Sequence, residues 1–333
     1  MSKNSYLITG GTGSFGNAFV ENLIKSKKKI SKLVIFSRDE LKQSIMSAKY
    51  PHSKYPFIRF YIGDIRDYER ILTASEGIEN IVHAAALKQV PSTEYNPFEA
   101  IQTNIIGSQN VIKAALANNV KKVVALSTDK ACAPINLYGA TKLCSDKLFI
   151  SANNIKGERK IKFSVVRYGN VFGSRGSVFP LFKSLIKEKS FPITDKNMTR
   201  FNISLEEGVS IVFWALQNSY GGEILIPKLK SFKIIDLAKA MSPKKKIEII
   251  GIRPGEKIHE QMISKSDSYN TIEMKNSYAI LGTNSKSIKK YYLKKFKAKK
   301  VKDGFEYSSN LNSDFMYINQ LKKIIQNYEK KLQ

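Results

Sequence analysis

The chain has 333 residues, of which 42% are hydrophobic, so it can form one large domain or two closely joined ones with a sizeable core. Its formal net charge is +27, which raises the question of nucleic-acid binding. The lysines are spread over the predicted helices and are densest within residues 286–303, and no recognition helix or aromatic-interleaved basic stripe accompanies them. We therefore expect no nucleic-acid partner, and a basic surface also suits a small anionic substrate.

The two cysteines, Cys132 and Cys144, provide no disulfide framework and favour a reducing compartment. Neither has metal-ligand spacing and the three histidines are scattered, so no metal site is predicted. No apolar run reaches the length of a membrane span. The first predicted strand begins too early to leave room for a signal peptide. These features predict a soluble, cytoplasmic protein with no membrane partner.

Residues 5–9 form a short predicted strand, which leads into a glycine-rich turn and an amphipathic helix over 17–25. In such a segment the first glycine permits a tight turn, the second lets a pyrophosphate approach the backbone, and the third packs helix on strand. The helix N-terminus adds amide donors and a favourable dipole. The segment predicts a dinucleotide site made by Gly10, Thr12, Gly13, Ser14, Phe15 and Gly16.

The second predicted strand, residues 33–36, ends without the acidic residue that would bind the ribose hydroxyls of NAD. A basic group at this position accommodates a 2′-phosphate. Arg38, with Lys42 one turn into the next helix, therefore favours NADP as the cofactor. The alternative interpretation is a solvated helix start capped by Asp39. The candidate contacts at this strand end are Ser37, Arg38, Asp39 and Lys42.

Two further strands are predicted over 58–63 and 80–83, and a long helix over 98–118. This alternation of strands and helices with short links predicts a Rossmann-type α/β fold with a doubly wound parallel sheet. Candidate cofactor residues follow these strands or lie in the helix: Asp64, Ile65, Ala84, Ala85, Lys88 and Thr103. Lys88 could instead reach the substrate or face solvent.

The apolar strand over 123–126 ends at Thr128-Asp129-Lys130, and ligands bind at the carboxyl ends of strands in open α/β sheets. Asn136 is a predicted helix N-cap, and Tyr138 and Lys142 lie four apart, on one face of the helix. A fixed cation beside a phenol lowers a pKa that is ~10 when unperturbed, so the phenol can take a proton from an alcohol. The competing interpretation is a surface Tyr and Lys on an ordinary helix.

The glycine-rich start, Tyr138-x-x-x-Lys142, and Thr128 ten residues before the tyrosine together resemble the extended short-chain dehydrogenase/reductases, which act on nucleotide sugars. The resemblance covers essentially the whole chain. It implies that Thr128 bonds the substrate hydroxyl and that Tyr138 is the acid/base. Lys142 would lower the pKa of Tyr138 and hold the nicotinamide ribose. The resemblance also implies a homo-oligomer, either a dimer or a hexamer.

Asp129 and Lys130 narrow this resemblance further. Hexose 4,6-dehydratases that retain configuration at C5 tend to have Thr-Asp-Glu here, whereas this chain has Thr-Asp-Lys. The chain is similar to the C5-inverting 4,6-dehydratases of UDP-N-acetylglucosamine, which begin pseudaminic acid biosynthesis. Elimination needs an acid and a base, which we assign to Asp129 and to Lys130; as a base, Lys130 requires a lowered pKa. The alternative is that Lys130 only forms an ion pair with Asp129 at the strand end. Val171 would contact the cofactor, and the implied substrate contacts are Lys88, Asn170, Arg175, Thr199, Arg200, Arg253 and Glu256.

We expect an NADP-binding Rossmann domain over 1–172, to which residues 202–228 return. A smaller nucleotide-sugar-binding region is expected over 173–201 and 229–333. Two alternatives remain open. A nucleotide-sugar epimerase would need the cofactor and Tyr138 but no acid and base after Thr128, and a non-catalytic NADP-binding regulator would often lack the tyrosine or the lysine.

Overall fold

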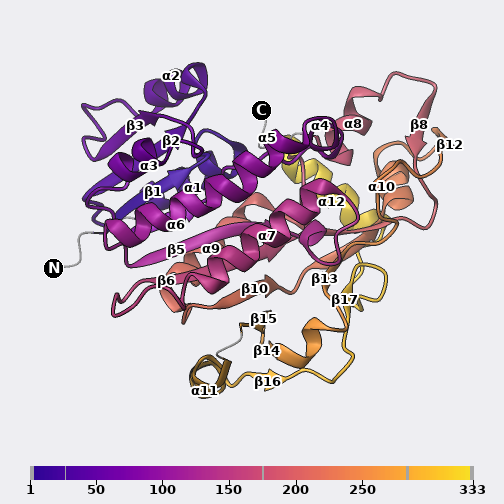
Figure 1. The fold of residues 1–333 in the computed structure, drawn as a ribbon. Helices are drawn as coiled ribbons and strands as arrows, with labels where there is room; N and C mark the ends of the chain where they lie inside the picture. The colour runs from indigo at the N-terminus through magenta and orange to yellow at the C-terminus, as the bar shows by residue number, and fades with distance from the viewer. Residues whose placement is uncertain (1–3, 27, 175, 283–284, 331–333) are drawn as a thin grey trace.

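The computed structural model describes residues 4–26, 28–174, 176–282 and 285–330. Its main sheet, which crosses the molecule in Figure 1, contains all the strands predicted above. The strands of this sheet are β1 (Ser5–Thr9), β2 (Lys32–Ser37), β3 (Ile58–Ile62), β4 (Asn80–His83), β5 (Lys122–Thr128), β6 (Lys162–Tyr168), β10 (Glu223–Pro227), β14 (Thr271–Glu273), β15 (Ser277–Leu281) and β16 (Lys299–Lys300). They lie in the order β16-β14-β15-β10-β6-β5-β4-β1-β2-β3.

The part of the sheet from β3 to β10 is parallel, so the carboxyl ends of its strands meet at one edge. The chain order reverses between β1 and β4, which lie side by side. Doubly wound sheets bind ligands outside the strand ends at such a switch point. Strands β15, β14 and β16 extend the sheet in antiparallel fashion. The predicted Rossmann-type α/β fold is confirmed.

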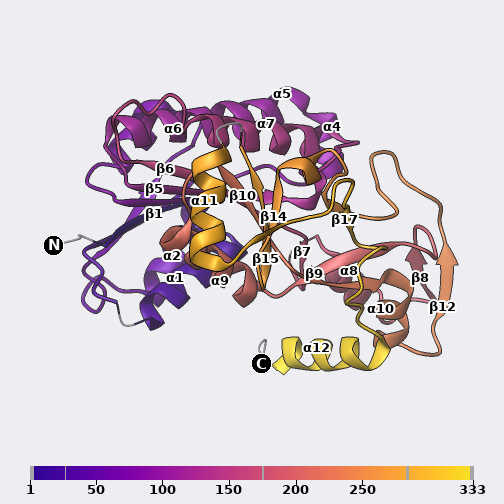
Figure 2. The same ribbon diagram turned by 90° about the horizontal axis from the view of Figure 1, so that it is seen from below.

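Helices cover both faces of the sheet. Their bounds are α1 (Ser14–Lys25), α2 (Glu40–Lys49), α3 (Tyr68–Ala74), α4 (Val90–Tyr95), α5 (Pro97–Ile101), α6 (Gly107–Ala117), α7 (Leu137–Ser151), α8 (Val178–Ser184), α9 (Leu205–Asn218), α10 (Ile234–Met241), α11 (Ser285–Phe296) and α12 (Ile318–Lys330). In Figure 2, α6 and α7 lie on one side of the sheet and α1 and α9 on the other. The apolar strands between these layers are buried on both faces, as parallel sheets require.

Two predicted helices differ in detail from the structure. Helix α1 begins earlier than expected, directly after its N-cap Gly13. The predicted continuous helix over 98–118 is interrupted by a π turn, Gln102–Ile106. In this turn the buried Asn104 side chain bonds the backbone N–H and carbonyl of Leu87, at 2.8 and 2.9 Å. The widened turn therefore coincides with a polar side chain that ties the helix to the segment after β4.

Smaller sheets stand beside the main sheet, on the right in Figure 1. They pair β7 (Asn170–Val171), β9 (Thr199–Ile203) and β11 (Lys230–Lys233), β8 (Ser190–Ile193) with β12 (Lys246–Ile249), and β13 (Gln261–Ile263) with β17 (Tyr307–Ser308). A second cluster of buried apolar side chains joins α8, α10 and α12. Strands β14 to β16 instead pack on the larger core, although they fall within the predicted region 229–333. The assignment of cofactor and substrate to two regions stays a prediction.

Among the described helices, none has the length and apolar composition needed to cross a bilayer. In the same part of the chain, no group of three or more histidine, cysteine or acidic side chains is arranged to hold a metal ion. Both cysteines are free thiols, with Cys132 buried and Cys144 exposed.

Candidate active site

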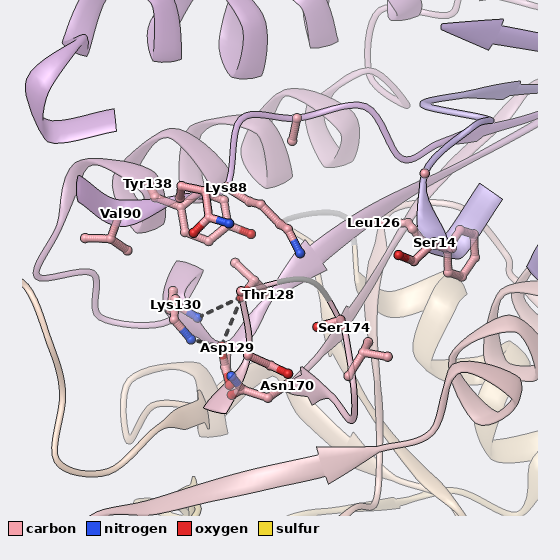
Figure 3. Close-up of a pocket in the computed structure, with 18 of the residues that line it drawn as sticks. Ser14, Lys88, Val90, Leu126, Thr128, Asp129, Lys130, Tyr138, Asn170 and Ser174 are labelled. Carbon is pink, nitrogen blue, oxygen red and sulfur yellow. Dashed lines mark hydrogen bonds and ion pairs between the residues drawn. The ribbon is translucent and has the colours of Figure 1, made fainter. Parts of the chain in front are cut away.

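A cavity of about 1460 Å³ lies at the carboxyl edge of the parallel strands. All the cofactor-binding candidates named above line it. Figure 3 shows Ser14 on one side of this cavity and Thr128, Asp129, Lys130 and Tyr138 gathered on the other. The fold therefore brings the glycine-rich turn and the predicted catalytic residues to one site, although they are more than a hundred residues apart in the chain.

The glycine-rich turn fits a dinucleotide. Gly10 has φ +67°, and a Cβ there would lie 3.0 Å from the Ala85 Cα, so a larger residue would be strained and crowded. A Cβ at Gly16 would lie 2.2 Å from the Gly11 carbonyl oxygen, so this glycine permits the close approach of α1 to the turn. Helix α1 has no side-chain cap. Its first amides therefore face the cavity as donors suited to phosphate oxygens.

The end of β2 has both features predicted from the sequence, namely a basic group for a 2′-phosphate and a helix start capped by Asp39. Asp39 caps α2 by accepting the Lys42 N–H at 2.9 Å, and the Lys42 ammonium pairs with the same carboxylate. The Arg38 guanidinium is 53% exposed and lies 3.5 Å from Asp64. Asp64 also pairs with Arg66 at 2.7 Å, which helps to hold its pKa below the usual value despite partial burial. Arg38 is thus the better placed of the two predicted cations for an added phosphate.

Tyr138 and Lys142 lie on α7, which starts as predicted after Asn136, whose side chain accepts the Gly139 N–H at 2.8 Å. Burial raises the pKa of Tyr138 to about 12, while the Lys130 ammonium and the Thr128 hydroxyl act in the opposite direction. The predicted lowering of the Tyr138 pKa is therefore wrong, because burial outweighs the groups that lower it. Burial lowers the pKa of Lys142 itself, and Lys130 is a cation that lowers the pKa of Tyr138.

Asp129 and Lys130 form a short 3₁₀ turn directly after β5, capped by Thr128. The Lys130 ammonium lies 3.1 Å from Asp129 Oδ1 and 2.9 Å from Glu260 Oε1. Burial raises the pKa of Asp129, and the nearby Glu260 raises it further, as a catalytic acid requires. For Lys130, burial lowers the pKa, but the two carboxylates outweigh it and raise the pKa above the usual value. The predicted lowering of the Lys130 pKa is therefore wrong.

The predicted phosphate-binding arginines converge on Glu256. Arg253 pairs with the Glu256 carboxylate through two nitrogens, each at 3.0 Å, and Arg200 approaches it to 3.8 Å. Burial raises the pKa of Glu256, but Arg253 and Arg200 outweigh it and hold the pKa below the usual value. All three side chains line the cavity. Glu256 thus holds the two cations close enough to serve one anionic ligand.

One predicted substrate contact, Thr199, is not found in the cavity lining. Its buried hydroxyl instead bonds His259 Nδ1 at 2.8 Å and Ser309 Oγ at 2.7 Å. The Thr199 hydroxyl therefore links β9 to His259 and to the segment after β17. Arg175 lies outside the described residues. Asn170 does line the cavity, as does Lys88.

Five buried polar atoms on the cavity wall accept or donate no hydrogen bond within the described residues: Thr103 Oγ1, Asp129 Oδ2, Asn170 Oδ1, Ser177 Oγ and Glu260 Oε2. Unpaired buried polar atoms are costly, so they fit a site that receives a polar ligand. Ser177 was not predicted, nor were Lys257 and Glu260, which also line the cavity. Lys257 and Glu260 follow the predicted contacts Arg253 and Glu256 in the chain, but no local sequence pattern indicated that these three side chains line the cavity.

The sequence pattern of the family described as polysaccharide biosynthesis protein matches residues 6–281. The chain belongs to this family. One relative, UDP-N-acetylglucosamine 4,6-dehydratase (inverting) from Campylobacter jejuni subsp. jejuni serotype O:2, is 52% identical over 340 residues, which cover 98% of this chain and 99% of that protein. UDP-glucose 4-epimerase from Rickettsia bellii is 46% identical over 281 residues, which cover 82% of each chain.

The X-ray structure of Pen from Bacillus thuringiensis superimposes on this chain with a TM-score of 0.88 at 38% identity, covering 98% of both chains. These relatives confirm the family resemblance drawn from the sequence. Their names describe two different reactions, dehydration and epimerisation. The side chains in the cavity must therefore decide between them.

Proposed function

We propose that the chain is a C5-inverting UDP-N-acetylglucosamine 4,6-dehydratase, a hydro-lyase that forms UDP-2-acetamido-2,6-dideoxy-β-L-arabino-hex-4-ulose. One observation carries this proposal: the acid–base pair Asp129–Lys130 lines the same cavity as Tyr138. An epimerase has no use for such a pair, because it removes no water. The inverting dehydratase that is 52% identical over nearly the whole chain supports the same function.

Oxidation of the sugar at C4 is the first step. A nicotinamide cofactor, when bound, supplies the hydride chemistry by accepting hydride from C4 and later returning it to C6. Thr128 orients the C4 hydroxyl, and Tyr138 takes its proton. The Lys130 ammonium and the Thr128 hydroxyl favour the phenolate that this transfer needs, against the effect of burial. Lys142 holds the nicotinamide ribose.

Elimination of water follows, because the C4 ketone makes the C5 proton acidic. Lys130 removes this proton as a neutral amine, and Asp129 protonates the C6 hydroxyl, which leaves as water. Burial and the neighbouring Glu260 favour the protonated form of Asp129. Lys130 is an ammonium in its ion pairs, so it must lose a proton before it acts. A proton then reaches C5 on the opposite face, which inverts that centre.

Proton NMR of the purified protein with UDP-N-acetylglucosamine tests this function. Dehydration is expected to produce a C6 methyl doublet and to remove the C4 proton signal. Epimerisation, the second candidate favoured by the Rickettsia bellii relative, would change only the ring couplings. A spectrum with altered couplings and no methyl signal would replace the proposed function by the second candidate.

We further propose NADP as the cofactor. Arg38 supports this choice, because its guanidinium is exposed at the end of β2, where a 2′-phosphate would lie. The Arg38→Ala variant should lose affinity for NADP(H) by about tenfold or more, with little change for NAD(H), since one charge-assisted contact contributes about 1.5–3 kcal/mol. Calorimetric titration with both cofactors checks this result, with Arg59→Ala, a substitution in β3 outside the cavity lining, as the control. Equal losses for both cofactors would contradict the NADP assignment.

The diphosphate of the substrate is proposed to bind near Arg200 and Arg253. Arg253→Ala should raise KM about tenfold with a much smaller effect on kcat, because a contact remote from the reacting carbon contributes mainly uniform binding. Steady-state kinetics check the split, and Arg159→Ala, an exposed arginine outside the cavity lining, should change neither constant. A fall in kcat at unchanged KM would move the diphosphate elsewhere.

Assembly and context are also proposals. Tyr95 and Phe98 on neighbouring α4 and α5 are 86% and 64% exposed, and such side chains support a homo-oligomer, a dimer or a hexamer. Light scattering on the purified protein would give its mass. The product belongs to pseudaminic acid biosynthesis if the inverted configuration at C5 is found, and a cytoplasmic location agrees with the two free thiols.

A further inference from the structure

Glu260 is a buried carboxylate at the wall of the active-site cavity. Its side chain is 2% exposed, and Oε1 lies 2.9 Å from the Lys130 ammonium and 3.7 Å from Arg200 Nε. Its backbone N–H donates to Ser309 Oγ at 2.9 Å, and its carbonyl accepts the Ser309 N–H at 2.8 Å. Glu260 is therefore held in place by the segment after β17, independently of its contact with Lys130.

Ion pairs join Asp129, Lys130, Glu260 and Arg200 into one chain of charges, which continues from Arg200 to Glu256. Lys257 on the cavity wall is a further cation that acts on Glu260. One oxygen of each carboxylate, Asp129 Oδ2 and Glu260 Oε2, is buried without a hydrogen-bond partner. Groups this close titrate as a set, so a change in the charge of one shifts proton binding by the others.

Elimination requires a particular protonation state of Asp129 and Lys130. It begins with a neutral Lys130 amine and a protonated Asp129, and it ends with an ammonium and a carboxylate. One proton moves from C5 to Lys130 and another moves from Asp129 to the leaving hydroxyl, while the C5–C6 double bond forms. The ion pair of the Lys130 ammonium and the Asp129 carboxylate holds the same number of protons. Transfer of one proton from Lys130 to Asp129 along their 3.1 Å contact therefore produces the neutral amine and the protonated acid that elimination needs. Asp129 and Lys130 must therefore hold one proton between them at the pH of the reaction; we call it the working proton.

Arg200 works against that requirement, because a fixed cation near the pair favours loss of its proton. Glu260 lies between Arg200 and Lys130 and carries the opposite charge. We propose that Glu260 is a positioning residue for the dehydration, which fixes the Lys130 amine beside Asp129 and offsets the charge of Arg200, so that the pair keeps its working proton at neutral pH. This inference rests on the proposed dehydratase function.

The neutral isostere Glu260→Gln tests the inference. Removing the negative charge weakens proton binding by both Asp129 and Lys130, so both limbs of the bell-shaped pH profile of dehydration should move to lower pH, by about 1–3 units. At the upper limb the variant should still oxidise C4, and reduced cofactor should accumulate because elimination fails. Tyr138 also lies near Lys130, so C4 oxidation is followed separately by the cofactor absorbance.

Two companion variants complete the test. Glu260→Asp keeps the negative charge but moves it away from Lys130 by one methylene group. Its pH profile should therefore shift in the same direction as that of Glu260→Gln, but by less. It also serves if the glutamine variant does not fold, which circular dichroism would reveal. Glu223→Gln is the matched control, because Glu223 is a buried carboxylate at the amino end of β10, outside the cavity lining, and bonds Tyr292 at 3.0 Å. Its pH profile should coincide with that of the wild-type enzyme.

The outcomes separate this inference from the function on which it rests. A profile for Glu260→Gln that falls at every pH without moving would mean a purely structural role and would overturn the inference. A profile identical to that of the wild-type enzyme would do the same. If the wild-type enzyme produces no C6 methyl signal, the proposed function fails instead.

Discussion

Replacing Tyr138 by phenylalanine should lower turnover by about 100- to 10,000-fold, the range typical for loss of a general acid–base group. The ring and its packing remain, so binding of UDP-N-acetylglucosamine should be nearly unchanged. The lost hydroxyl is the proton acceptor for C4 oxidation, so no reduced cofactor should form. Single-turnover absorbance of the nicotinamide checks the chemistry, and calorimetry checks substrate binding.

Tyr50→Phe is the control for this variant, because Tyr50 is also buried but packs against Tyr55 outside the cavity lining. It should keep wild-type turnover. If Tyr138→Phe also turned over at a near-wild-type rate, Tyr138 would have no part in proton transfer, and another group on the cavity wall would have to take the C4 proton.

Replacing Lys130 by alanine should stall the reaction after C4 oxidation. Dehydration should slow by about 100- to 10,000-fold, because the base for the C5 proton is gone. Oxidation should also slow, but less, since the Lys130 ammonium lowers the pKa of Tyr138. Reduced cofactor should therefore accumulate with substrate, while NMR shows no C6 methyl signal.

Reaction of the wild-type enzyme in D₂O completes this second test by placing deuterium at C5 with inverted ring geometry. Lys147→Ala, an exposed lysine on the same helix α7, is the control and should dehydrate normally. Full dehydration by Lys130→Ala would show that Lys130 serves only as an ion-pair partner of Asp129 and Glu260. Retained configuration at C5 would rule out the inverting reaction.

The Tyr138 and Lys130 variants also probe a point on which sequence and structure differ. The four-residue spacing of Tyr138 and Lys142 correctly predicts their shared helix face, but it does not reveal which cation acts on the phenol. In the folded protein burial raises the pKa of Tyr138, although the Lys130 ammonium acts in the opposite direction. A pKa depends on burial and on charges within a few ångströms, which the spacing along one helix cannot supply.

The sequence alone determined the features that depend on neighbours in the chain. Glycine at position 10 is required by a turn with positive φ, and Asn136 caps α7 through the amide three residues ahead. The alternation of strands and helices was likewise enough for the Rossmann-type sheet, because each apolar strand and each helix stripe is a local pattern.

Only the tertiary structure decided which charged groups meet. Glu260 reaches Lys130 across 130 residues of sequence, Glu256 gathers Arg200 and Arg253, and the hydroxyl of Thr199 is taken by Ser309. No local pattern specifies these contacts, because they arise where β9, β13 and β17 close over the end of β5. The packing of these strands buries the charged groups. Burial strengthens each ion pair and destabilises each carboxylate that has no ion-pair partner.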